Sequence, residues 1–298
     1  MKVICFEPGY DEKHRTVLRA LAAGIPGAEV CPLGAYEPCD VAVIFGLVKR
    51  AYKATWAKQP VLDRHRGDRL LVVESAFVRR GDYWAMGWGG INGRADFRSA
   101  SVGDDRWRAM GVKTRPWRSP RDAKASRLGP VVVCGQLPRD TNVQDTDHPA
   151  WCRHVMAWLA AERIPAVFRP HPRIDDPEVY GIAPALWDTG KIAETLAWAR
   201  AAVVFNSTSG VDAALAGVPV VALDRGAFCW PIASHRLDVL RDPGSSPGAG
   251  PGSSPGAGPR CPSRRAWLAG LGYSQWTLEE MRAGLPWRHL TRALGDDG

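Results

Sequence analysis

Short apolar runs alternate with amphipathic stretches along the chain, which is the pattern of strands that alternate with helices. Near the N-terminus, residues 2–6 predict a buried strand, and residues 11–23 predict a helix on which Val17, Leu18 and Leu21 share one face. Two later apolar runs have the continuous character of parallel strands buried on both faces: 41–45 and 70–73.

A second and more regular series of elements begins near residue 130. The expected strands are 130–134, 166–168, 202–205 and 218–223. The expected helices are 150–162, 191–200 and 211–216. Alternation at this spacing is typical of a parallel sheet with right-handed crossovers. Two such series in one chain predict an α/β fold of two Rossmann-like domains that face a cleft.

The sequence also predicts where the parts of the chain begin and end. The expected parts are an N-terminal domain at 1–125, a C-terminal domain at 126–275 and a helical tail at 276–298. Residues 79–126 are rich in Arg, Trp and Gly with weak periodicity, so loops and short elements are expected there. The octapeptide PGSSPGAG occurs twice within 243–259, and this composition predicts a flexible surface insertion. Thr277 and Glu280 form the pattern of a capping box.

Composition and charge narrow the class of protein. Hydrophobic residues make up 45% of the chain and charged residues 23%, which is typical of a globular protein. The sequence contains neither an apolar run that could span a bilayer nor a signal peptide, so we expect a cytoplasmic protein. Seven cysteines without a CxxC pair predict reduced thiols and no structural zinc. The net charge of +8 favours an anionic partner.

A turn rich in hydroxyl residues is the strongest local signal for chemistry. Asn206, Ser207, Thr208, Ser209 and Gly210 lie between an expected strand and an expected helix. Hydroxyl groups and backbone N–H groups at the start of a helix can bind a phosphate. The same residue types are also favoured as ordinary helix N-caps, so the turn by itself predicts either a phosphate site or a plain cap.

A second loop follows the expected strand at 166–168. Arg169 and His171, with His171 between two prolines, lie at the carboxyl end of that strand, where open α/β sheets bind ligands. Both side chains can hydrogen-bond a phosphate oxygen, although a histidine between prolines can equally be structural. Because the next strand ends at the hydroxyl turn, both loops should emerge at the same edge of the sheet.

An acidic residue ends a strand in the first half of the chain. Glu74 follows the apolar run 70–73 and is a candidate general base for a hydroxyl acceptor, or else an ion-pair partner of Arg79 or Arg80. The stretch 88–96 is dense in glycine, which predicts either unusual backbone angles near a ligand or a surface turn.

Together these motifs resemble those of the capsule polysaccharide biosynthesis family, whose best-known members are Kdo transferases. The His-Pro and Ser-rich motifs are also similar to those of bacterial sialyltransferases. The matching blocks are Val72–Asn92, Gly135-Gln136-x-Pro138-x-Asp140, Arg169–Pro172, Asn206–Gly210 and Ala213–Val220. The resemblance implies a GT-B-like fold, an active site between the domains, and a metal-independent reaction without a cofactor.

The resemblance also implies roles for individual residues. Glu74 and His171 would be catalytic. The donor-binding residues would be Gln136, Arg169, His171, Asn206, Ser207, Thr208, Ser209 and Gly210. The acceptor or cleft residues would be Arg79, Arg80, Asn92 and Asp96. The family motif has two adjacent acids, whereas this chain has Ser75 at the second position. Either the base is Glu74, Asp82 or Asp96, or the acceptor is of a different kind.

The expected function is therefore transfer of a sugar from a CMP- or UDP-linked nucleotide sugar to a hydroxyl acceptor. The acceptor is either a bacterial glycan or a modified DNA base, such as the hydroxymethyl-pyrimidines of phage genomes. The DNA case draws on the positive charge and the Arg/Trp-rich stretch 79–118, because such side chains can contact phosphates and stack on bases. The alternatives are a non-catalytic protein that binds a nucleotide or nucleic acid, and a sugar-nucleotide epimerase.

Overall fold

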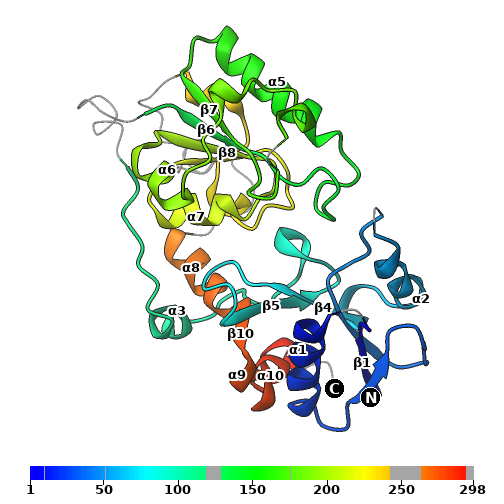
Figure 1. Ribbon diagram of the computed structural model, residues 1–298. Coiled ribbons are helices and arrows are strands. Elements are labelled where there is room, and N and C mark those ends of the chain that lie inside the picture. Colours follow the sequence, from blue (N-terminus) through cyan, green and yellow to red (C-terminus); the bar gives the residue numbers. More distant parts are fainter. Residues whose placement is uncertain (10, 51, 119–128, 175, 242–262, 293–298) are drawn as a thin grey trace, which may run out of the picture. The chain divides into compact units, whose positions relative to one another are not determined.

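The computed structural model describes all residues except 10, 51, 119–128, 175, 242–262 and 293–298 (Figure 1). The expected flexible insertion at 243–259 lies outside the described residues. Contacts between Cα atoms divide the chain into unit 1, residues 1–111 and 268–298, and unit 2, residues 112–267. The sequence boundaries were expected at 125/126 and 275/276.

Unit 1 contains a six-stranded sheet in the order β10-β5-β4-β3-β1-β2. Its strands are β1 (Val3–Glu7), β2 (Glu29–Pro32), β3 (Val41–Phe45), β4 (Leu70–Ser75), β5 (Tyr83–Trp88) and β10 (Gln275–Thr277). Strands β1 to β4 are parallel, while β5 and β10 are antiparallel to their neighbours. The three strands predicted from the apolar runs are confirmed as β1, β3 and β4.

Strand β5 corrects the expectation of loops and short elements over residues 79–126. Five of its six residues are buried, so it lacks the alternation of polar and apolar residues that reveals a half-exposed strand. Its two tryptophans and one glycine also weaken the ordinary strand signal. Neither β2 nor β10 was predicted, since each has only three or four residues.

Helices of unit 1 pack against its sheet, and the two faces of the sheet belong to two separate apolar cores. The α-helices are α1 (Glu12–Ala23), α2 (Gln59–Leu62), α3 (Asp105–Ala109), α8 (Arg264–Tyr273), α9 (Leu278–Arg282) and α10 (Leu285–Thr291). The boundary between the two units falls within α8. Val17, Met281 and Leu290 share a core with β1, β3, β4 and β5, so α1, α9 and α10 pack on the same face. The opposite face buries Phe6, Ile44 and other side chains.

Two of the unit 1 helices begin at caps that the sequence indicates. Asp11 caps α1, where its carboxylate accepts the N–H of His14 at 3.1 Å. The predicted capping box of α9 is confirmed: Thr277 Oγ1 accepts Glu280 N–H at 3.2 Å, and Glu280 Oε2 accepts Thr277 N–H at 2.8 Å. These bonds satisfy N–H groups that a helix start otherwise leaves without a partner.

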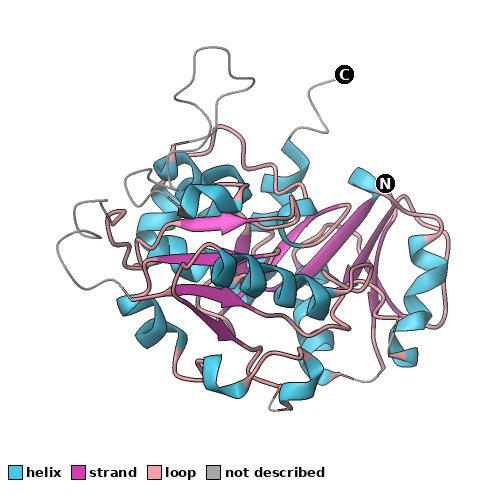
Figure 2. Cartoon of the chain, turned by 90° about the horizontal axis from the view of Figure 1, so that it is seen from above, coloured by secondary structure: helices cyan, strands magenta, loops and turns pink. Residues whose placement is uncertain are grey.

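Unit 2 contains a four-stranded, all-parallel sheet in the order β7-β6-β8-β9. Its strands are β6 (Val131–Cys134), β7 (Ala166–Arg169), β8 (Ala201–Val204) and β9 (Val220–Ala222), and its helices are α5 (His148–Ala161), α6 (Ile192–Trp198) and α7 (Ser209–Leu215). Figure 2 shows helices in cyan beside the strands in magenta. All seven elements predicted for this region are confirmed, with ends that differ by a few residues.

Two further expectations concern membrane segments and cysteines. Within the described ranges, every helix is too short or too polar to cross a bilayer. The six cysteines of these ranges are free thiols, and five of them are buried. Burial raises the pKa of Cys5, Cys134 and Cys229 to about 12, so these thiols pack as small apolar groups.

Candidate functional site

Four polar side chains gather at the carboxyl edge of the unit 2 sheet. Gln136, His171, Asn206 and Asp224 each lie two residues beyond the end of β6, β7, β8 and β9, respectively. The strands are parallel and in register, so their carboxyl ends form one edge. The chain order reverses at β6, because β7 pairs on one side of it and β8 on the other. Such a switch point is where open α/β sheets bind ligands.

Buried amides bridge this switch point. Gln136 Nε2 donates to Asn206 Oδ1 at 2.9 Å, and Asn206 N–H donates to Gln136 Oε1 at 3.3 Å. Asn206 Nδ2 also donates to Asn142 O at 2.9 Å and to Asp224 Oδ1 at 2.8 Å. Gln136 is 7% exposed and Asn206 is fully buried, so these amides hold the loops after β6, β8 and β9 together.

Two residues that sequence reasoning missed hold the backbone of Gln136. His148 Nε2 accepts the Gln136 N–H at 2.9 Å, and the Tyr180 hydroxyl donates to Gln136 O at 2.7 Å. Gly135 permits this approach, because a Cβ there would lie 2.7 Å from the Phe168 ring and 3.1 Å from Tyr180. The sequence offers only a weak signal for His148, a histidine next to proline before a predicted helix.

The hydroxyl turn has an internal hydrogen-bond network. Ser207 Oγ accepts the Ser209 N–H at 3.2 Å and lies 3.1 Å from Ser209 Oγ. Gly210 N–H donates to Ser207 O at 3.0 Å. A Cβ at Gly210 would lie 2.5 Å from Cys229 Sγ, so this glycine is required for packing. Thr208 occupies the N-cap position of α7 but makes no side-chain cap.

The two candidate residues at the end of β7, Arg169 and His171, make different contacts. Arg169 donates to Asp188 Oδ2 at 3.2 Å and to Thr195 Oγ1 at 3.0 Å, and its side chain is 11% exposed. The charge of Arg169 is therefore paired within the unit. His171 is half-buried, and its Nδ1 accepts the Arg173 N–H at 3.2 Å. A neutral ring in this arrangement carries its proton on Nε2, which makes that atom a hydrogen-bond donor.

In unit 1, the glycine-rich stretch folds back onto the end of β4. Glu74 Oε1 accepts the backbone N–H of Asn92 at 2.5 Å. Asn92 is 2% exposed and has a left-handed φ of 53°, while Gly89 has a φ of 71°. A Cβ at Gly90 would lie 2.9 Å from Arg94 O. The unusual backbone angles expected for 88–96 are therefore present at Gly89 and Asn92, and they occur in turns as well as at ligand sites.

The other candidates of unit 1 lie in different surroundings. Asp82 pairs with Arg79 at 3.1 Å, and both side chains are exposed. Arg80 Nε donates to Ala76 O at 3.2 Å. Asp96 forms a bridge with Trp88, which is in register with Leu71, three residues before Glu74 on β4. The structure thus brings Asn92 to Glu74, and places Asp96 near the opposite end of the strand.

Unit 1 has its own switch point at β1, between β2 and β3, and a buried lysine lies there. Lys58 is 4% exposed, and its Nζ donates to Phe45 O at 2.5 Å and to Leu47 O at 3.3 Å. Burial, with a smaller effect of Lys49, lowers the pKa of Lys58 to about 8. The ring of His14 stacks on Phe45 with centroids 3.6 Å apart. No sequence pattern marked Lys58.

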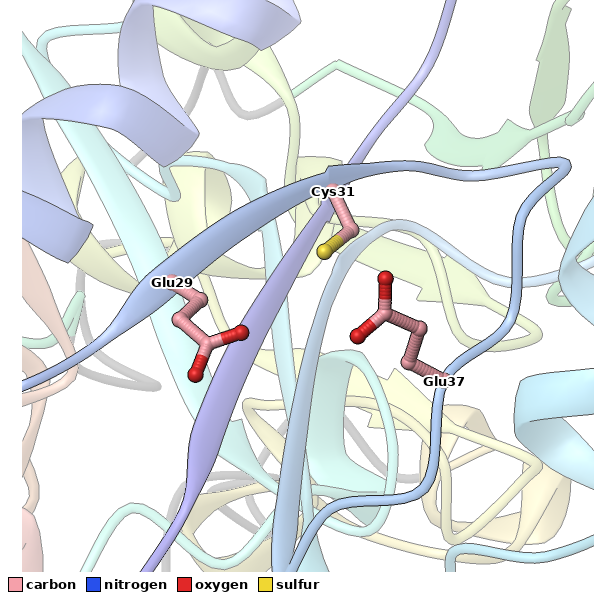
Figure 3. A group of neighbouring side chains, drawn as sticks. All are labelled: Glu29, Cys31 and Glu37. Atoms are coloured by element: carbon pink, nitrogen blue, oxygen red, sulfur yellow. The ribbon is translucent and has the colours of Figure 1, made fainter.

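A group of possible metal ligands lies at the other edge of this sheet. Glu29, Cys31 and Glu37 have ligand atoms within 4.8 Å of one another (Figure 3). Lys2 Nζ lies 3.6 Å from Glu29 and 3.5 Å from Glu37. Glu29 pairs with Ile4 near the start of β1, so the group is at the amino edge, away from Glu74. The single positive charge of Lys2 offsets one of the two negative charges of these carboxylates.

Comparisons with known proteins address the fold. No family model matches the chain, and no curated protein sequence matches it. Among solved structures, KpsC beta Kdo 2,7 transferase of Thermosulfurimonas dismutans superposes with a TM-score of 0.55 at 13% identity, covering 96% of this chain and 98% of that one. KpsC beta Kdo 2,4 transferase of the same organism gives 0.50 and 14%, with 92% and 90% covered. The chain therefore has a GT-B-like α/β fold.

Proposed function

We propose that this protein is a glycosyltransferase that moves a sugar from a nucleotide-sugar donor to a hydroxyl acceptor. The observation that carries the proposal is the edge of unit 2, where loops from four parallel strands bring amide, hydroxyl and imidazole groups around one switch point. The likeness to two Kdo transferases, which extends over more than nine-tenths of the chain, supports the same reaction class.

In the proposed reaction, Glu74 is the base, and side chains at the carboxyl edge of the unit 2 sheet are the donors to the leaving group. Glu74, oriented by the Asn92 N–H, takes the proton of the acceptor hydroxyl. The acceptor oxygen forms a bond to the anomeric carbon, while the bond from that carbon to the phosphate oxygen breaks. The departing nucleotide keeps the electron pair and the negative charge.

Protein groups stabilise that charge in a metal-independent mechanism. The hydroxyls of Ser207, Thr208 and Ser209 and the Nε2–H of His171 are the proposed donors to the phosphate. Helix α7 has only seven residues, so the proposal relies on these side chains and not on the helix dipole. Gln136, Asn206 and Arg169 contribute by fixing the loops that carry these donors.

We favour a glycan acceptor over DNA. The DNA hypothesis relies on tryptophans in 79–118 that could stack on bases, yet three of the four, Trp84, Trp88 and Trp107, are only 4%, 2% and 7% exposed. The fourth, Trp117, is half-buried, and Arg264 already lies over its ring. In the same stretch, Arg79 is paired with Asp82. Both structural neighbours are Kdo transferases by name, which also favours a glycan acceptor.

Nucleotide binding tests this proposal directly. Thermal unfolding should be measured with CMP, UDP, GDP and ADP in the presence of EDTA, for the wild type, His171→Ala and the control His154→Ala. His154 is an exposed residue of α5. A nucleotide at about 100 times its Kd should add roughly 2.7 kcal/mol of stability.

We expect one nucleotide to stabilise the wild type and His154→Ala but not His171→Ala. If no nucleotide stabilised any of the three proteins, the proposed donor site would be contradicted. A nucleotide that stabilises all three equally would retain a donor site but exclude His171 from it. Binding without any transfer to glycan acceptors would favour the non-catalytic alternative.

A further inference from the structure

His148 is buried at the start of α5, inside an aromatic enclosure. It is fully buried. Its ring stacks on Trp151 with centroids 5.2 Å apart and meets the Phe205 ring edge-on at 5.8 Å. Burial lowers the pKa of His148 to about 4, although the carboxylate of Asp147, the N-cap of α5, has a smaller effect in the opposite direction.

The hydrogen bonds of His148 determine which nitrogen carries its proton. A backbone N–H can only donate, so the bond from Gln136 N–H makes Nε2 an acceptor. The Cys152 thiol lies 3.6 Å from the same Nε2. The proton of the neutral ring is therefore on Nδ1, which has no hydrogen-bond partner among the described residues. An imidazolium would turn a second donor toward the Gln136 N–H.

The peptide of Gln136 is thereby held from both sides. His148 accepts its N–H, and the Tyr180 hydroxyl donates to its carbonyl oxygen. With its backbone fixed, Gln136 presents its side-chain amide to Asn206, which precedes the hydroxyl turn. A continuous series of hydrogen bonds thus leads from His148 through Gln136 to the loop that carries Ser207.

We infer that His148 is a positioning residue for the donor site, which acts through Gln136 as a neutral imidazole protonated at Nδ1. It touches neither the nucleotide nor the sugar. Its role is to hold the loop after β6 so that Gln136 can clamp Asn206 across the switch point. The effect on nucleotide affinity rests on the proposed function, whereas the tautomer and the bond to Gln136 do not.

Substitutions that keep or remove the acceptor test this role. His148→Gln retains an acceptor oxygen, His148→Leu removes it, and His154→Leu is a control on the exposed face of the same helix. We expect His148→Leu to weaken binding of the stabilising nucleotide about tenfold and His148→Gln by about threefold or less. His154→Leu should bind as the wild type does. Equal affinity of His148→Leu and the wild type, or equal loss in both His148 variants, would overturn the inference.

NMR of the wild-type protein gives a test that needs neither ligand nor a folded variant. The ¹⁵N shifts of His148 should identify the Nδ1-protonated tautomer, without titration between pH 7 and 5, and the Gln136 amide should exchange slowly with solvent. A ring protonated on Nε2, or one that titrates near its ordinary pKa of 6.5, would contradict the inference. If no nucleotide binds but the NMR result holds, the proposed function fails while the positioning of Gln136 stands.

Discussion

In unit 2, neutral amides bridge the ends of three strands, whereas in unit 1 a buried ammonium binds the end of β3. Gln136 and Asn206 satisfy each other's hydrogen bonds and involve one carboxylate, Asp224. Lys58 donates instead to the carbonyl oxygens of Phe45 and Leu47. The amide network keeps its charge state over a wide pH range, while the lysine does not. The two edges therefore differ in how their buried polar groups are satisfied and in whether those groups titrate near neutral pH.

The largest effect should come from removing the proposed base. Glu74→Gln keeps the shape of the side chain and an oxygen that can accept the Asn92 N–H, but it cannot take a proton. We expect the rate of sugar transfer to fall about 10²- to 10⁴-fold, with nucleotide binding unchanged. Transfer rates and nucleotide-induced thermal shifts of the same samples measure both quantities. A rate within tenfold of the wild type would return the role of base to Asp82 or Asp96.

Removing buried amides compares the two units by stability. Asn206→Ala leaves Gln136 and two acceptors without their partner, so we expect a loss of about 3 to 4 kcal/mol of unfolding free energy. In unit 1, the fully buried Gln275 accepts the N–H groups of Phe77 and Val78, just after Glu74.

Gln275→Ala should cost less, about 2 kcal/mol, because only its bonds to the two N–H groups, 3.0 and 3.3 Å long, have strong partners. Its third bond, from Nε2 to Met110 Sδ at 3.7 Å, has a weak acceptor. Urea unfolding of both variants, with hydrogen exchange to assign the loss to a unit, measures the difference. A larger loss for Gln275→Ala would contradict the view that the unit 2 edge is the more rigid one.

The last comparison separates the units by the pH dependence of stability. The pKa of Lys58 is about 8 in the folded protein against 10.5 unfolded, so the unfolded state binds more protons between these values. The contribution of Lys58 to stability therefore rises with pH from about 8 to 10.5, by at most about 3 kcal/mol. Lys58→Met should lack this rise.

His148 makes the free energy of unfolding depend on pH in the same direction, but at acidic pH. Its pKa is about 4 folded against 6.5 unfolded, so stability in unit 2 falls as the pH is lowered from 6.5 to 4. Hydrogen exchange of peptides from each unit, measured across both windows, should show the alkaline change in unit 1. Burial also lowers the pKa values of His14, His65 and His289 in unit 1, so the acidic change of unit 2 is assigned to His148 by its loss in His148→Gln. If both the alkaline and the acidic change disappeared in Lys58→Met, this assignment would be contradicted.

Apolar runs predicted the parallel strands because burial on both faces leaves a continuous signature, as in Val131–Cys134 and Val41–Phe45. The short strand β10 escaped prediction because Gln275 is polar, yet it is buried by a contact with residues almost 200 positions away. Long-range pairing of this kind leaves no local pattern in the sequence.

The residues of the candidate site also fall into two groups, those that a local sequence pattern indicates and those that only the structure reveals. Gln136, Ser207 and His171 follow apolar runs, so local reasoning places them at a sheet edge. His148 and Lys58 belong to no such pattern, because their roles depend on backbone groups of distant residues, Gln136 and Phe45. Sequence reasoning thus identified residues by their type and position, while their partners required the structure.

The central claim is sugar transfer, and detection of the product tests it most directly. The protein should be incubated in EDTA with CMP- and UDP-linked sugars and either an anionic glycan or hydroxymethylated DNA, with Glu74→Gln as control. Mass spectrometry should then show a glycan heavier by one sugar residue, together with stoichiometric release of the nucleotide, from the wild type alone. Release of nucleotide without any product would contradict sugar transfer, whereas equal product from Glu74→Gln would contradict only the role of Glu74 as base.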